Sequence, residues 1–130
     1  MDKSKPMRQL TVVTKDKIGL LASVSGLLGK NKININSISA EKVEEEAVIR
    51  LVVEDYDKAK GILEKAGYKI AEDDVIITTI KDRPGELSKL AQKMADAKIN
   101  IENLFMVGKK GGEAVLAIKV DNIEEARKLL

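Results

Sequence analysis

The sequence contains no cysteine and no histidine among its 130 residues. Without cysteine the chain cannot form disulfides, thiolate metal sites or a cysteine nucleophile. Without histidine it lacks the side chain that most often acts as a general base near neutral pH and most often binds zinc. No paired carboxylates converge in the pattern to replace them. We therefore predict no enzyme, with no catalytic residues, no metal ligands and no cofactor.

Aromatic residues and net charge are also scarce. The chain has three aromatic side chains, Tyr56, Tyr68 and Phe105, too few for a platform on which bases could stack. Its net charge of +2 offers no electrostatic attraction for nucleic acid or for an anionic membrane. No apolar run approaches the roughly 20 residues of a membrane-spanning helix. The polar start, MDKSKPM, lacks the apolar core of a signal peptide, so we expect a cytoplasmic protein.

What the sequence does contain is a duplication. At an offset of 66 residues, DKIGLLASVSGLLGKNKINI is repeated as DRPGELSKLAQKMADAKINI, with Gly19 over Gly85 and Asn34 over Asn100. After one inserted residue, EAVIRLVVEDYDKAKGIL is repeated as EAVLAIKVDNIEEARKLL. The insertion falls in a predicted hairpin turn, where a change of length costs little free energy. We interpret the chain as two copies of one unit.

Hydrophobic periodicity divides each copy into strands and helices. In the first copy the apolar residues recur every three or four positions in two segments, which predicts helices over 20–30 and 55–66. Short β-branched or alternating segments predict strands over 9–14, 33–41, 46–53 and 68–71. Asp73 and Asp74 then lead into the second copy. The second copy ends after its second helix, so its final strand is apparently missing.

The predicted order of elements is strand, helix, strand, strand, helix, strand. This βαββαβ order is that of the ferredoxin-like fold, an antiparallel sheet with both helices on one face. We therefore predict an α+β protein of two ferredoxin-like units, the first over residues 8–72 and the second over 73–130. The sheet edge left by the absent strand is either completed by the N-terminal copy or a partner, or results from truncation.

The loop between the first strand and the first helix is the candidate binding site of each unit. Gly19 and Gly85 permit close approach of the backbone to a ligand, and the helix start leaves N–H groups that favour a carboxylate. Asp16 and Asp82 offer an acceptor for an ammonium group. Each of these residues also has an interpretation without a ligand. The glycines would only form a turn, and the aspartates would only start the helix. Asn34 and Asn100 would only hydrogen-bond backbone groups at a strand edge or bulge.

These segments resemble the ACT domain, a small-molecule-binding regulatory module of amino-acid metabolism. The resemblance is carried by KDRPGELSKLAQKMADAKINIENL and, in the first copy, by KDKIGLLASVSGLLGKNKININSI. ACT domains commonly bind amino acids at interfaces between two domains. The resemblance implies that the ligand contacts are Asp82, Arg83, Gly85, Glu86, Leu87 and Asn100, and in the first copy Asp16, Lys17, Gly19, Leu20, Leu21 and Asn34. Ile18 replaces Pro84 in the first copy, which predicts a less rigid turn there.

Nothing in the sequence is left over for a catalytic domain, so the chain resembles stand-alone tandem ACT proteins. The resemblance implies a non-catalytic protein that senses an amino acid or regulates a separate enzyme. The open sheet face and edge and the absent final strand predict a homo-oligomer, such as a dimer. The alternative is a protein-interaction or oligomerisation module with no small-molecule ligand.

The helix of about 11 residues between Asp82 and Asn100 spans roughly 16 Å, so these two residues would meet only across an interface.

Overall fold

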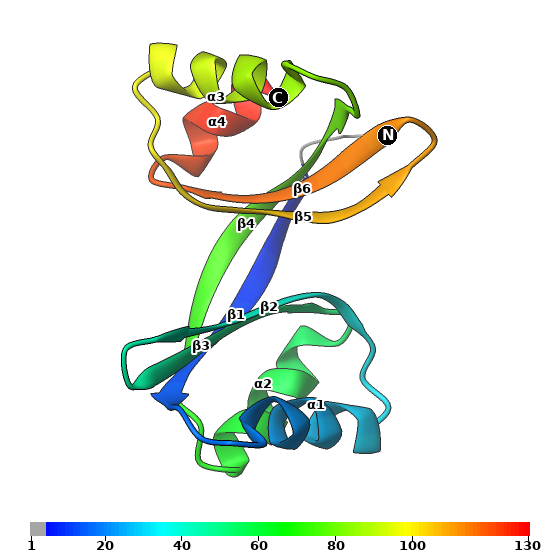
Figure 1. The fold of residues 1–130 in the computed structure, drawn as a ribbon, viewed down its shortest axis with the longest axis vertical. Coiled ribbons are helices and arrows are strands. Elements are labelled where there is room, and N and C mark those ends of the chain that lie inside the picture. The colour runs from blue at the N-terminus through cyan, green and yellow to red at the C-terminus, as the bar shows by residue number, and fades with distance from the viewer. Residues whose placement is uncertain (1–4) are drawn as a thin grey trace. The chain divides into compact units, whose positions relative to one another are not determined.

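A computed structural model describes residues 5–130 and divides them into two compact units, each a sheet with two helices on one face (Figure 1). The first unit comprises Arg8–Asp73. The second comprises Asp74–Leu130 together with residues 5–7 from the other end of the chain. The prediction of an α+β protein with two ferredoxin-like units is confirmed.

The first unit contains two helices and the strands of one antiparallel sheet. Within it the strand order is β2-β3-β1, with the first residues of β4 beside β1. Helices α1 and α2 cover one face of this sheet (Figure 1). The elements that build the unit are β1 (Lys5–Lys15), α1 (Leu20–Lys30), β2 (Ile35–Val43), β3 (Glu46–Val53), α2 (Tyr56–Lys65) and β4 (Ile70–Lys81).

The second unit repeats this plan. Its strand order is β5-β6-β4, with residues 5–7 of β1 beside β4. Helices α3 and α4 cover one face of its sheet (Figure 1). Its further elements are α3 (Glu86–Asp96), β5 (Ile101–Lys110), β6 (Glu113–Val120) and α4 (Ile123–Leu129).

Strand β4 differs from the sequence expectation. The pattern predicted a short strand over 68–71 followed by a connection at Asp73 and Asp74, but β4 runs without a break from Ile70 to Lys81. Its first residues complete the sheet of the first unit and the rest begins the second. The two aspartates have low strand propensity, and this local signal concealed a strand that pairing with β1 maintains.

The position of the fourth strand in the second unit is filled from the N-terminal end of the chain. Residues 5–7 of β1 lie beside β4 in that unit. Of the two explanations open for the missing strand, the structure therefore supports completion by the N-terminal copy. Pairing along β4 matters because an unpaired strand edge leaves backbone N–H and C=O groups free to pair with another chain.

Each unit has its own hydrophobic core between its sheet and its helices. In the first unit Leu10, Ile49 and Leu51 of the sheet pack against Val24, Leu28 and Leu63 of the helices, all at most 2% exposed. In the second unit Ile76, Leu116 and Ile118 pack against Leu90 and Met94. The helical apolar stripes and the strand alternation read from the sequence therefore define the two cores. These cores fix the position of the β1–α1 loop in the first unit and of the equivalent β4–α3 loop in the second unit.

Candidate functional site

The loop before the first helix of each unit requires glycine. Gly19 and Gly85 begin helices α1 and α3 with φ of 85° and 87°, in the left-handed region. Among residues 5–130, no heavy atom beyond the two adjacent residues lies within 4 Å of the place where a Cβ would stand at either position. The glycines are therefore required by backbone conformation and not by crowding. The space beside them is open, as close approach of a ligand would need.

The loop aspartates tie each loop to the neighbouring hairpin. The backbone N–H of Asp16 donates to the carbonyl of Glu45 at 2.9 Å, and that of Asp82 donates to the carbonyl of Gly112 at 2.9 Å. Their carboxylates pair with equivalent lysines, Asp16 with Lys42 at 4.0 Å and Asp82 with Lys109 at 3.2 Å. Neither aspartate caps its helix, because the N-cap residues are the glycines. The helix-start interpretation of Asp16 and Asp82 is therefore wrong.

A cleft opens beside this loop in the first unit, which we call the first-unit cleft. It has a volume of about 280 Å³ and lies between the start of α1 and strands β2 and β3. It brings together five of the six residues predicted in this copy, all but Asn34. Its lining consists of Asp16, Lys17, Gly19, Leu20, Leu21, Ala22, Ala40, Glu41, Lys42, Ala47 and Ile49.

The first-unit cleft combines buried apolar residues with charged residues. Leu20, Ala47 and Ile49 are buried, and the neighbouring Leu21 is 47% exposed. Asp16, Lys17 and Lys42 bring one carboxylate and two ammonium groups to this lining. The carboxylate of Glu41 instead pairs with Arg50 at 3.4 Å, because neighbouring strand residues point to opposite faces of the sheet. No acidic residue stands in the first turn of α1 and no side chain caps it, so its free N–H groups carry the positive end of the helix dipole. The cleft can thus bind both charges of a zwitterionic amino acid and contact an apolar side chain of that ligand.

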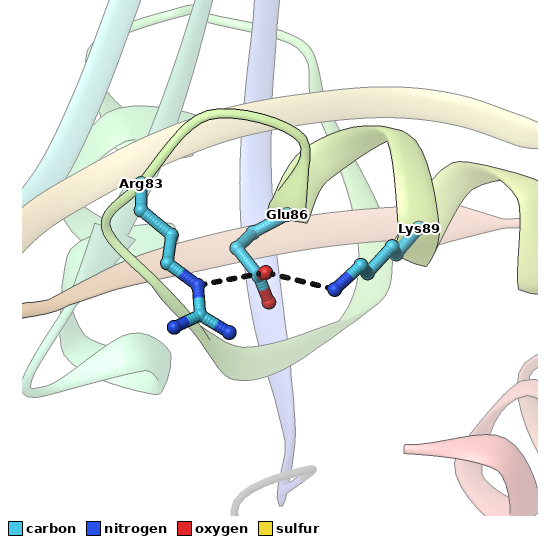
Figure 2. A network of polar contacts seen from close by, with 3 residues as sticks. All are labelled: Arg83, Glu86 and Lys89. Carbon is cyan, nitrogen blue, oxygen red and sulfur yellow. Dashed lines mark hydrogen bonds and ion pairs between the residues drawn. The ribbon is translucent and has the colours of Figure 1, made fainter.

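The second unit carries an ion-pair cluster at the equivalent place. Glu86 of α3 accepts from Arg83 Nε at 3.0 Å and from Lys89 Nζ at 3.2 Å, both at the same carboxylate oxygen (Figure 2). The Glu86 side chain is only 14% exposed although both cations are well exposed. Hydrogen bonds from Arg83 and then Lys89 hold the pKa of Glu86 below its ordinary value of 4.5. Glu86 is therefore ionised at neutral pH and is already supplied with two cationic partners.

A cleft of the second unit is lined mostly by residues outside the loop. It has a volume of about 450 Å³ and lies among β4, α3 and the end of α4. Glu86 is the one predicted site residue that lines it; its other residues include Thr78, Lys93 and Leu130. Asp82, Arg83, Gly85 and Leu87 do not line it. The two copies of the loop therefore share a backbone and differ in the surface they present.

The asparagines lie at the opposite end of each helix from the loop. Asn34 and Asn100 immediately precede β2 and β5, separated from Asp16 and Asp82 by an entire helix. The carbonyl of Asn34 accepts from the N–H of Glu54 at 3.3 Å, and that of Asn100 accepts from the N–H of Asp121 at 3.2 Å. These bonds attach the strand start to the segment before the second helix of each unit. Within one unit, the structure does not bring asparagine and aspartate together.

The strand wall of the first-unit cleft was not predicted from the sequence. Ala40, Glu41 and Lys42 come from β2, and Ala47 and Ile49 from β3. The alternation in β3 had placed Ala47 and Ile49 on one side of the strand. The pairing of Ala40 with Ile49 and of Lys42 with Ala47 brings β2 residues to the same face, and this register follows from pairing across the hairpin.

Two kinds of feature are absent from residues 5–130. No helix in this part of the chain is both long and apolar enough to cross a membrane. No three acidic, histidine or cysteine side chains of these residues gather closely enough to hold a metal ion. Glu44 and Glu45 are exposed in the β2–β3 hairpin, as expected of a solvated turn.

Comparison with known proteins identifies one family over nearly the whole chain. Residues 5–130 match the family described as an ACT domain pair. A crystal structure of a protein from Bacteroides thetaiotaomicron has a TM-score of 0.89 at 23% identity, covering 98% of this chain and 88% of that one. The regulatory subunit of aspartate kinase from Thermus thermophilus, in a ligand-free form, has a TM-score of 0.71 at 17% identity, covering 97% and 93%. At these identities the two structures show a shared fold.

A sequence relative matches part of the chain. An uncharacterized protein of Methanocaldococcus jannaschii is 42% identical over 65 residues, which is 48% of this chain. The match spans 45% of that relative, so this chain covers less than half of its length.

Proposed function

The chain belongs to the ACT domain family as a pair of ACT domains, and on this basis we propose that it is a non-catalytic regulatory protein that binds an amino acid. The observation that carries the proposal is the first-unit cleft. It gathers Asp16, Lys17, Gly19, Leu20 and Leu21 beside an open glycine backbone. A carboxylate suits the start of α1 and an ammonium suits Asp16, so the chemistry of the lining matches a small zwitterion.

The regulatory part of the proposal concerns a separate protein. One solved structure of similar fold is described as the regulatory subunit of aspartate kinase, which is the kind of role that we propose here. We propose that ligand binding changes the association of this chain with itself or with an enzyme of amino-acid metabolism. Strands β2 and β5 lie at the ends of their sheets, and such free edges favour a homodimer.

A thermal-shift screen of the purified protein against the twenty amino acids tests ligand binding. A ligand at 100 times its dissociation constant adds about 2.7 kcal/mol to the free energy of unfolding. The melting temperature should then rise by several degrees. A flat screen at millimolar concentrations, confirmed by calorimetry, would contradict the proposal.

The alternative function, an interaction module without a ligand, rests on the open face of the first sheet. Val13 and Val43 are 45% and 49% exposed there, beside a hollow of about 730 Å³ that Glu41, Glu46 and Arg50 also line. Exposed apolar side chains with a charged rim are typical of protein contacts. A protein of this kind would assemble equally well with and without amino acids, and light scattering measured in both conditions separates the two functions.

A further inference from the structure

The two loops have diverged at one position that decides what each can hold. Leu20 and Glu86 occupy the same place in the repeat, the first residue of α1 and of α3. Leu20 is 5% exposed and belongs to the core of the first unit, and it lines the first-unit cleft. Glu86 places a carboxylate there instead, bonded to Arg83 and Lys89 (Figure 2).

This difference changes the electrostatics of the helix start. The first turn of α1 has no acidic residue, whereas that of α3 has Glu86. A carboxylate side chain at a helix N-terminus satisfies the positive end of the dipole. An incoming carboxylate at α3 would meet a like charge and would have to compete with Glu86 for Arg83. At α1 it would meet Lys17 and no anion of the same turn.

The first-unit cleft also restricts the side chain of its ligand. Its wall is formed by Leu20, Leu21, Ala40, Ala47 and Ile49, which offer no hydrogen-bonding side-chain group. A polar or charged ligand side chain placed against this wall would lose its hydration without a new partner. Its volume of about 280 Å³ lies at the lower end of small-molecule sites. Asp16, Lys17 and Lys42 also line the cleft and supply the charges that the ammonium and carboxylate of the ligand need.

We propose that the first unit alone holds the amino acid, and that the ligand has an aliphatic side chain. The inference rests on the proposed function and specifies its ligand class and its site. The second copy keeps the glycine turn and the aspartate–lysine pair but fills the helix start with its own carboxylate. The ligands that fit this cleft are leucine, isoleucine and valine. The charged side chains of aspartate, glutamate, lysine and arginine do not suit its apolar wall, and that of tryptophan is too large for its volume.

The test is calorimetric titration of leucine, glutamate and lysine into the wild-type chain and three variants. Ala40→Leu adds bulk to the wall at an exposed position of β2. It should weaken leucine binding at least tenfold, since a single methylene in an apolar pocket changes binding about 10- to 200-fold. Leu20→Glu copies the second unit and should abolish leucine binding. Ser23→Glu places the same charge on α1 outside the cleft and should change the affinity less than twofold.

The outcomes separate the inference from the proposed function. The inference is supported if the wild-type chain binds leucine, if Ala40→Leu and Leu20→Glu remove this binding, and if Ser23→Glu keeps it. Because Leu20 is buried, the fold of Leu20→Glu is checked by circular dichroism. If Leu20→Glu proves to be unfolded, the test relies on Ala40→Leu alone. Leucine binding that Ala40→Leu leaves unchanged, or binding of glutamate or lysine in preference to leucine, overturns the inference but not the proposed function. A wild-type chain that binds none of the twenty amino acids overturns both.

Discussion

At the scale of single residues, conformation explains the two loop glycines. Gly19 and Gly85 adopt φ of 85° and 87°, where an L-residue places its Cβ too close to a carbonyl oxygen. Sequence reasoning left two roles open for them, a turn and close approach to a ligand. The positive φ establishes the turn, and the empty space around each glycine leaves room for the ligand.

Replacing a loop glycine by alanine should therefore destabilise the protein even though nothing blocks the methyl group. We expect Gly19→Ala to lower the free energy of unfolding by about 1–2 kcal/mol, the cost of the left-handed conformation. Urea denaturation of wild type and variant measures this difference.

Gly26 is the matched control for that experiment. It lies inside α1 and has no positive φ. Apart from the adjacent residues and the backbone of its own helix, no heavy atom of residues 5–130 lies within 4 Å of an added Cβ. Gly26→Ala should raise the free energy of unfolding by about 0.4–1 kcal/mol, because alanine has fewer unfolded conformations to lose. Equal effects of the same sign at Gly19 and Gly26 would show that the backbone conformation at Gly19 is not responsible.

Glu86 should make a pH-dependent contribution to stability. Arg83 and Lys89 lower its pKa in the folded chain below the ordinary 4.5. A carboxyl group of this kind stabilises the folded state above the unfolded pKa, and the contribution is lost as pH falls through the folded pKa. Glu86→Gln should therefore be less stable than wild type at pH 7, and the two should converge below pH 4.5. Urea denaturation at pH 7 and pH 3 checks this, and a difference independent of pH would contradict it.

At the scale of elements, the second helix of each unit is started by an equivalent cap. Asp55 accepts from the N–H of Lys58 at 3.3 Å, and Asn122 accepts from the N–H of Glu125 at 3.2 Å. Asparagine and aspartate are among the best N-cap residues, so the exchange preserves the cap. The first helix of each unit has no side-chain cap. The N–H of Leu20 donates to the carbonyl of Lys17 at 3.3 Å, so the next N–H groups of the first turn of α1 are those that a ligand would use.

Removing one of these caps should destabilise its unit. We expect Asp55→Ala to lower the free energy of unfolding by about 0.5–2 kcal/mol. Asp55→Asn retains a side-chain acceptor, as Asn122 does, and should cost far less. Thermal unfolding of both variants measures the effect. A loss as large for Asp55→Asn as for Asp55→Ala would mean that charge, and not the capping bond, is responsible.

At the scale of the whole molecule, the N-terminal end of the chain should stabilise the second unit. Residues 5–7 are assigned to that unit and lie beside β4. A chain that starts at Arg8 should leave one edge of β4 unpaired, and the β4 amides that face this edge should exchange with solvent at least tenfold faster, on the order of 1.4 kcal/mol of local opening.

Hydrogen exchange followed by mass spectrometry resolves this effect by segment. The amides of β2 and β3 provide the internal control, because they pair with each other in the first unit. Their exchange should be unchanged in the shortened chain. Uniformly faster exchange in both units would contradict a local role for residues 5–7.

The sequence by itself determined the duplication, the class of fold and the loop that carries the candidate site. It predicted α1 over 20–30 and β3 over 46–53 with the observed bounds. These features depend on residues a few positions apart, because helical and strand periodicities are local and the duplication shows them twice.

The tertiary structure alone decided which residues face the loop. The β2 wall of the first-unit cleft depends on a pairing register, the continuity of β4 depends on its pairing with β1, and the fourth strand of the second unit comes from the opposite end of the chain. Contacts between distant residues depend on which packing has the lowest free energy for the whole chain, and no local pattern contains that information.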